Sequence, residues 1–237
     1  MSFSRSLKER IKPVWEDCYN HPFVQKIGNG TLDKDIFMFY LKQDYKYLLE
    51  YAKIFALGAL RAADEQIIKN FTASQKAVLD EMNIHRSYMK AYGISLEEAD
   101  KTAPSLFNKA YTSNMMAVGY NSGILELMAA LLPCPWSYYD FASRLKESFK
   151  EKLENNFYKD WIETYAGKSF YESFEWFFPA MDKLCEGKNE GELEKITDIF
   201  KTSMEFEYLF WDMSYKNQMS FKTDPAPKNL STPLVLQ

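Results

Sequence analysis

Apolar residues recur along most of this chain at intervals of three and four, the spacing of helices that bury one face. In the longest such segment, up to Ala63, the stripe consists of Ile36, Tyr40, Tyr47, Leu48, Tyr51, Phe55 and Leu60. Similar patterns predict helices at 4–19, 65–92, 104–118, 122–152, 158–165, 169–185 and 190–217. No segment shows the strict alternation of a strand. The pattern therefore predicts an all-α bundle.

Capping residues place several helix starts. Thr31 is the expected N-cap of the long helix, and Ser95 with Glu98 forms a capping box for a short turn. Pro104 suits the first position of the next helix.

Composition agrees with this fold class. Hydrophobic residues make up 46% of the 237 residues, and only nine are glycine, fewer than turn-rich β folds need. We expect residues 1–219 to form a single helical catalytic domain. Residues 220–237, with three prolines from Thr223 on, are expected to be an unstructured or expression-derived tail.

Charge and hydropathy exclude several partners. The net charge is −4 without a long basic run, so nucleic acid is not an expected partner. No stretch approaches 18 uncharged apolar residues, and the charged N-terminus has no signal-peptide core. The sequence therefore predicts a cytoplasmic protein that does not bind a membrane.

Cysteines and histidines are few. An odd number of cysteines without CxxC spacing argues against a disulfide framework or a zinc site, and two histidines make a metal centre improbable. Glu81 and His85 share a helix face, but His85 is better interpreted as a hydrogen-bonding residue and His21 as a cap in its loop.

The segment LLPCPWSYYDF places Cys134 between Pro133 and Pro135 in an otherwise helical stretch. If Pro135 is the first residue of a restarted helix, Cys134 is its N-cap, where the helix dipole would lower the pKa of the thiol. Alternatively, Cys134 is a small buried residue at a kink. Both interpretations remain open from the residues alone.

Two carboxylates lie on apolar helix faces. Asp44 shares the stripe of Tyr47 and Tyr51, so it is either paired in the core or faces a cavity. Glu207 shares a stripe with Phe210, where aromatic surroundings should raise its pKa. Glu207 is therefore a better proton donor than Glu205, although a core ion pair would give the same pattern.

Five segments together resemble the TenA/thiaminase II family, in the same order along nearly the whole chain. These segments are HPFVQKIGNGTLDKDIFMFYLKQDYKYL (21–48), AYTSNM (110–115), ALLPCPWSYYD (130–140), WIETYAG (161–167) and EFEYLFWDMSY (205–215).

The resemblance implies a helical bundle of the haem-oxygenase type without haem, assembled as a homotetramer. It implies hydrolysis of 4-amino-5-aminomethyl-2-methylpyrimidine, or of thiamin, to the hydroxymethyl pyrimidine that re-enters thiamin synthesis. No metal or organic cofactor is implied.

The family's functional residues match positions in this chain. Cys134 corresponds to the nucleophile, Asp44 to a hydrogen-bonding partner of the aminopyrimidine, and Glu207 to the proton-transferring acid. The substrate-binding aromatics correspond to Tyr47, Tyr51, Tyr111, Tyr138, Tyr165 and Phe210. Pro135 departs from many members and would change how the following turn is held. The alternative is a non-catalytic pyrimidine-binding or regulatory protein on the same bundle.

Overall fold

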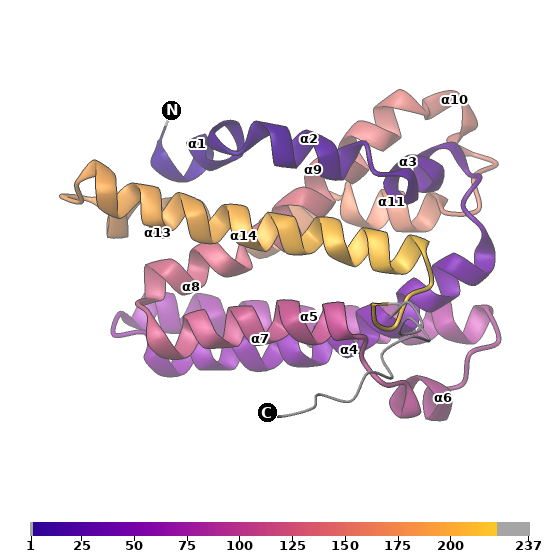
Figure 1. Ribbon diagram of the computed structural model, residues 1–237, viewed down its shortest axis with the longest axis horizontal. Helices are drawn as coiled ribbons and strands as arrows, with labels where there is room; N and C mark the ends of the chain where they lie inside the picture. The colour runs from indigo at the N-terminus through magenta and orange to yellow at the C-terminus, as the bar shows by residue number, and fades with distance from the viewer. Residues whose placement is uncertain (1, 222–237) are drawn as a thin grey trace, which may run out of the picture.

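The computed structural model describes residues 2–221, and every regular element in that range is a helix, which confirms the predicted all-α class (Figure 1). The elements are α1 (Phe3–Arg10), α2 (Lys12–Tyr19), α3 (Pro22–Asn29), α4 (Lys34–Arg61), α5 (Glu65–Ala91), α6 (Leu96–Lys101), α7 (Leu106–Asn121), α8 (Ile124–Leu131), α9 (Pro133–Ser148), α10 (Lys150–Leu153), α11 (Lys159–Tyr165), α12 (Lys168–Phe174), α13 (Phe177–Cys185) and α14 (Glu190–Tyr215).

The long helices form two layers. Helices α4, α5 and α7 lie side by side, and α14 crosses the molecule above them with α1 and α2 on its outer side (Figure 1). Helices α8 and α9 connect the layers and pack against α14. Gly58 of α4 lets α5 approach closely, because a Cβ there would collide with the ring of Phe71. This close pair carries the residues that form one side of the candidate site.

Aromatic side chains fill the space between the layers. The largest fully buried ones include Trp15, Tyr40, Tyr111 and Trp211, which come from α2, α4, α7 and α14. Trp211 packs within 5.2 Å of Phe23 and 5.0 Å of Tyr138, measured between ring centroids. The core therefore ties α14 to α3 and α9, and it fixes the position of the polar residues that α14 carries.

Several helix boundaries differ from the prediction. Asp33, not Thr31, caps α4, and its side chain accepts the Asp35 N–H at 2.8 Å. The segment 4–19 divides at Ile11, and 169–185 divides between α12 and α13. Helix α7 begins two residues after the predicted start at Pro104, with Ser105 as its N-cap. The predicted caps Ser95 and His21 are confirmed.

The Pro-Cys-Pro segment bends the chain at a different residue from the one predicted. Helix α8 ends at Leu131 and α9 begins at Pro133, so Leu132 is the N-cap and Cys134 lies inside the first turn. The prediction that Cys134 is an N-cap is wrong. Pro133 occupies the first position, where a missing N–H has no cost, and Leu132 keeps α-helical angles (φ −61°, ψ −33°). The predicted tail lies outside the described residues from position 222 on.

Within the described residues, no helix is both long enough and apolar enough to span a bilayer.

Candidate active site

A cavity of about 320 Å³ lies between α4, α5, α9, α11 and α12. Its floor is made of nearly inaccessible residues, among them Asp44, Tyr47 and Tyr138, which are each at most 5% exposed. Its rim includes the exposed residues Asp80 and Ser169. The cavity therefore extends from solvent-exposed residues to a buried floor rich in tyrosine.

Cys134 is half-buried and lines this cavity from the start of α9. Burial, and next the charge of Glu207, raise the pKa of its thiol well above the ordinary value. The sequence prediction of a lowered pKa is therefore wrong, because desolvation and a neighbouring carboxyl outweigh the helix dipole. The Tyr47 hydroxyl lies near the sulfur and acts to lower the pKa of the thiol, which offsets only part of the rise. Its distance and angle do not meet the criteria of a hydrogen bond, and it has no other partner in the described part of the chain.

Glu207 on α14 lies behind Cys134 and outside the lining of the cavity. The Tyr111 hydroxyl donates a 2.7 Å hydrogen bond to Glu207 Oε1. Burial raises the pKa of Glu207 to about 8, and the hydrogen bonds from Tyr111 and Cys134 offset only part of that effect. Glu205, in contrast, is exposed and lies 3.7 Å from Lys201. Of the two glutamates, Glu207 is the one placed to hold a proton beside the thiol.

Asp44 is both paired and in the cavity, so the two alternatives left open by the sequence are both true. His85 Nε2 lies 2.5 Å from Asp44 Oδ2, and the Tyr40 hydroxyl donates to the same oxygen at 3.3 Å. Burial alone would lower the pKa of His85, but the hydrogen bond and charge of Asp44 leave it raised. The imidazole on α5 therefore orients the carboxylate on α4.

Glu81 also lines the cavity, one helical turn before His85. The Tyr165 hydroxyl donates a 2.6 Å hydrogen bond to Glu81 Oε1. Burial raises the pKa of Glu81, and His85 and the hydrogen bond from Tyr165 partly offset this.

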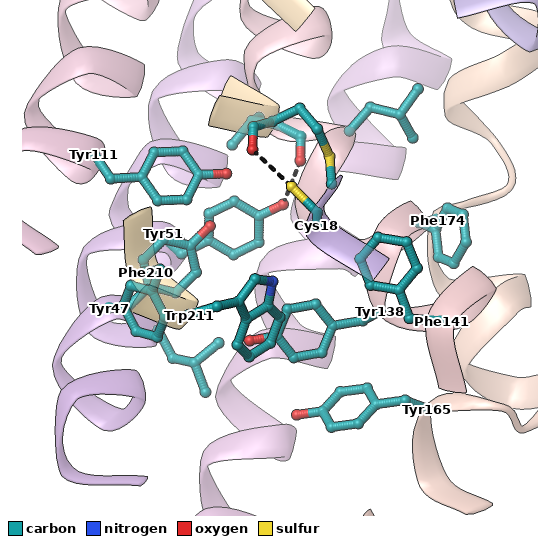
Figure 2. Close-up of a cluster of buried hydrophobic side chains, with 14 of the residues drawn as sticks. Cys18, Tyr47, Tyr51, Tyr111, Tyr138, Phe141, Tyr165, Phe174, Phe210 and Trp211 are labelled. Carbon is teal, nitrogen blue, oxygen red and sulfur yellow. Dashed lines mark hydrogen bonds between the residues drawn. The ribbon is translucent and has the colours of Figure 1, made fainter. Parts of the chain in front are cut away.

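The predicted aromatic residues are brought together, but not all of them reach the cavity. Tyr47 and Tyr51 stack with ring centroids 5.2 Å apart, and Tyr138 packs edge-on to Tyr165 at 4.9 Å across the cluster (Figure 2). All four line the cavity. Tyr111 and Phe210 lie outside the lining as the described residues define it, each packed against Tyr47.

Sequence reasoning missed Glu81, Phe170 and Phe174 as lining residues, and it did not connect His85 with Asp44. The available signal was the polar i, i+4 pair of Glu81 and His85 on α5. That spacing does not identify Asp44, 41 positions before His85, as the partner of the imidazole. No group of three or more His, Cys, Asp or Glu side chains in residues 2–221 is arranged to hold a metal ion.

Comparison with known proteins adds to this geometry. The model of the TENA/THI-4/PQQC family matches residues 8–217. An aminopyrimidine aminohydrolase of Helicobacter pylori is 43% identical over 218 residues, which cover 92% of this chain and all of that protein. An aminopyrimidine aminohydrolase of Halalkalibacterium halodurans is also 43% identical, over 92% of this chain and 98% of its own.

Solved structures agree with the fold. A TenA family transcription regulator from Silicibacter superimposes with a TM-score of 0.82 at 28% identity, over 90% of this chain and 96% of its own. A domain with a haem oxygenase-like fold from Shewanella denitrificans gives a TM-score of 0.72 at 13% identity, over 90% of this chain and 92% of its own. The predicted haem-oxygenase-like bundle is therefore confirmed.

Proposed function

The chain belongs to the TENA/THI-4/PQQC family, and we propose that it is an aminopyrimidine aminohydrolase with thiaminase II activity. It hydrolyses 4-amino-5-aminomethyl-2-methylpyrimidine, and thiamin, to the hydroxymethyl pyrimidine for thiamin salvage. One observation carries this proposal: the thiol of Cys134 opens into a tyrosine-lined cavity with a carboxyl of raised pKa directly behind it. The cavity is of a size typical of small-molecule sites.

Binding of the flat pyrimidine depends on the floor of the cavity. The stacked rings of Tyr47 and Tyr51 and the ring of Tyr138 offer apolar faces to an aromatic ligand. Asp44, held by His85, accepts hydrogen bonds from the amino group of the ring. These contacts would place the ring carbon C6 against the sulfur of Cys134.

The first chemical step couples two proton movements. Below pH 8 Glu207 is mainly protonated, so it gives its proton to ring nitrogen N1 and makes C6 electrophilic. The carboxylate formed then accepts the proton of the neighbouring Cys134 thiol as the sulfur bonds to C6. A thiol of raised pKa thus becomes a nucleophile only when substrate has taken the proton of Glu207.

The later steps restore the ring. The aminomethyl group enters the reaction protonated. The amino group at C4 pushes its electron pair into the ring, and the exocyclic C–N bonding pair leaves with the nitrogen of that ammonium group as ammonia. Water then adds its oxygen to the methylene carbon, and one of its protons passes to the released ammonia. Finally the C6–S bond breaks, and the proton on N1 returns through Glu207 to the sulfur. The protonated amine and water are thereby converted to alcohol and ammonium.

The remaining expectations concern the whole molecule. The cavity takes its walls from helices between residues 34 and 174, which supports one catalytic domain over residues 1–219. Leu60 and Tyr120 are 81% and 65% exposed at the ends of α4 and α7, which supports an interface in the homotetramer that the family resemblance implies. A cytoplasmic location is part of the same proposal.

Replacing the nucleophile tests the mechanism. Cys134→Ser should lower kcat for the aminomethyl pyrimidine by on the order of 10³-fold or more, while the pyrimidine still binds, because a hydroxyl is a far weaker nucleophile than a thiolate. Cys185→Ser, on α13 and away from the cavity, is the matched control and should keep wild-type kcat. Steady-state release of ammonia and isothermal titration measure the two quantities. A fully active Cys134→Ser protein would contradict the mechanism, and a wild-type protein that binds without turnover would support the non-catalytic alternative.

A further inference from the structure

The cavity contains more acidic groups than recognition of the pyrimidine uses. Asp44 and Cys134 line the cavity, and Glu207 lies behind the sulfur of Cys134. In the proposed function these three groups bind the pyrimidine ring and activate it. Glu81 is half-buried and lines the same cavity, and it follows the exposed rim residue Asp80 in the sequence. It is therefore a carboxyl group of the cavity wall that recognition and activation of the ring do not use.

Glu81 is held in place on one side only. Tyr165 donates to Oε1 at 2.6 Å, and the backbone carbonyl of Glu81 lies 3.3 Å from His85 Nδ1. Within residues 2–221, Oε2 has no hydrogen-bond partner, although the side chain lines the cavity. A carboxylate that is fixed through one oxygen, on a side chain that lines a cavity, is arranged to accept a further hydrogen bond from a ligand.

The orientation of the substrate follows from the two ends of the cavity. The ring must lie at the floor for Cys134 to reach C6, so the substituent on the neighbouring carbon is directed away from the floor, toward the wall that Glu81 and the rim residues form. From these positions we infer that Glu81, oriented by Tyr165, binds the protonated aminomethyl group of the substrate and sets the preference for a primary ammonium leaving group over a thiazolium. This inference rests on the proposed function and assigns a specificity-determining residue within it.

The chemistry distinguishes the two leaving groups. Both carry a positive charge, but a primary ammonium donates N–H hydrogen bonds and a thiazolium ring nitrogen has no hydrogen to donate. A charge-assisted hydrogen bond in a partly desolvated site contributes more than charge attraction alone. Loss of the Glu81 carboxylate should therefore affect the aminomethyl pyrimidine more than thiamin.

The kinetic test compares two isosteric variants on both substrates. Glu81→Gln keeps an oxygen for Tyr165 but presents an amide to the ammonium, so kcat/KM for the aminomethyl pyrimidine should fall by on the order of 10- to 100-fold. The fall for thiamin should be less than about 3-fold. Glu65→Gln, which removes an exposed carboxylate of the same helix that pairs with Lys69 and lies outside the cavity lining, should change neither value beyond about 3-fold. Equal losses on both substrates, or no loss, would overturn the inference.

A binding test separates this inference from the proposed function. In the Cys134→Ser background, titration calorimetry compares the aminomethyl pyrimidine with the neutral hydroxymethyl pyrimidine. Adding Glu81→Gln should weaken binding of the former by about 10-fold or more and leave the latter within about 2-fold. If wild-type protein turns over neither substrate, the proposed function fails, and this titration still decides the role of Glu81. Weakened binding of both ligands alike, or no binding of the amine, would overturn that role.

Discussion

Asp44 and Glu207 are two carboxyl groups beside one cavity, and they are almost equally inaccessible, with exposures of 3% and 2%. Their partners differ in kind. Asp44 meets the imidazole of His85 at 2.5 Å, whereas Glu207 meets the phenol of Tyr111 at 2.7 Å. An imidazole can carry a compensating positive charge, and a phenol cannot. Asp44 is therefore paired with a histidine of raised pKa, whereas burial raises the pKa of Glu207 to about 8 and the hydrogen bond from Tyr111 offsets only part of that rise.

Because the two carboxyl groups are almost equally buried, the hydrogen-bond partner of each one determines what it can do chemically. A carboxylate fixed by His85 is oriented to accept hydrogen bonds from an aminopyrimidine. An acid held only by Tyr111 and a thiol can deliver a proton near neutral pH. With Asp44 in the cavity lining and Glu207 behind the thiol of Cys134, the protein can recognise a ring with one carboxyl and activate it with the other. Each prediction below removes one side of this comparison.

Removal of the acid should have the largest effect. Glu207→Gln keeps the side-chain shape and the hydrogen bond from Tyr111 but has no proton to transfer, so kcat should fall by on the order of 10²- to 10⁴-fold. Glu205→Gln changes an exposed neighbour on the same helix and should stay within about 2-fold of wild type. Steady-state kinetics at pH 7 measures both, and the reverse ranking would show that Glu205 is the acid.

Removal of the imidazole should have an intermediate effect that acts through Asp44. His85→Leu deprives the carboxylate of its closest partner, so kcat/KM should fall by on the order of 10- to 100-fold. His85→Gln retains a side-chain N–H donor and should recover part of the loss. Because the role is one of positioning, most of the change should lie in KM. A loss confined to kcat, with no recovery by glutamine, would argue that His85 takes part in the chemistry.

The sequence predicts these residues unequally. Helical periodicity placed Asp44 and Glu207 on apolar stripes and distinguished Glu207 from Glu205, because burial of a helix face is a local property of the pattern. The pairing of Asp44 with His85 depends on how α4 packs on α5, which the pattern does not encode. The predicted direction of the pKa shift of Cys134 was wrong for the same reason. The helix dipole is a local property, but desolvation of the thiol and the charge of Glu207 come from tertiary packing.

Removal of the hydrogen bond from the Tyr111 hydroxyl to Glu207 should have the smallest effect. The Tyr111 hydroxyl favours the carboxylate and so holds the pKa of Glu207 lower than burial alone would. In the wild type the acid form is active, and kcat/KM should fall as the pH rises through about 8. Tyr111→Phe removes the donor, so this alkaline limb should move upward by about one pH unit, with a change at pH 7 of less than about 10-fold. A pH profile of kcat/KM measures the shift, with circular dichroism to confirm folding. A limb that moves downward would mean that Tyr111 stabilises the protonated acid, and that its phenol acts on Glu207 as an acceptor.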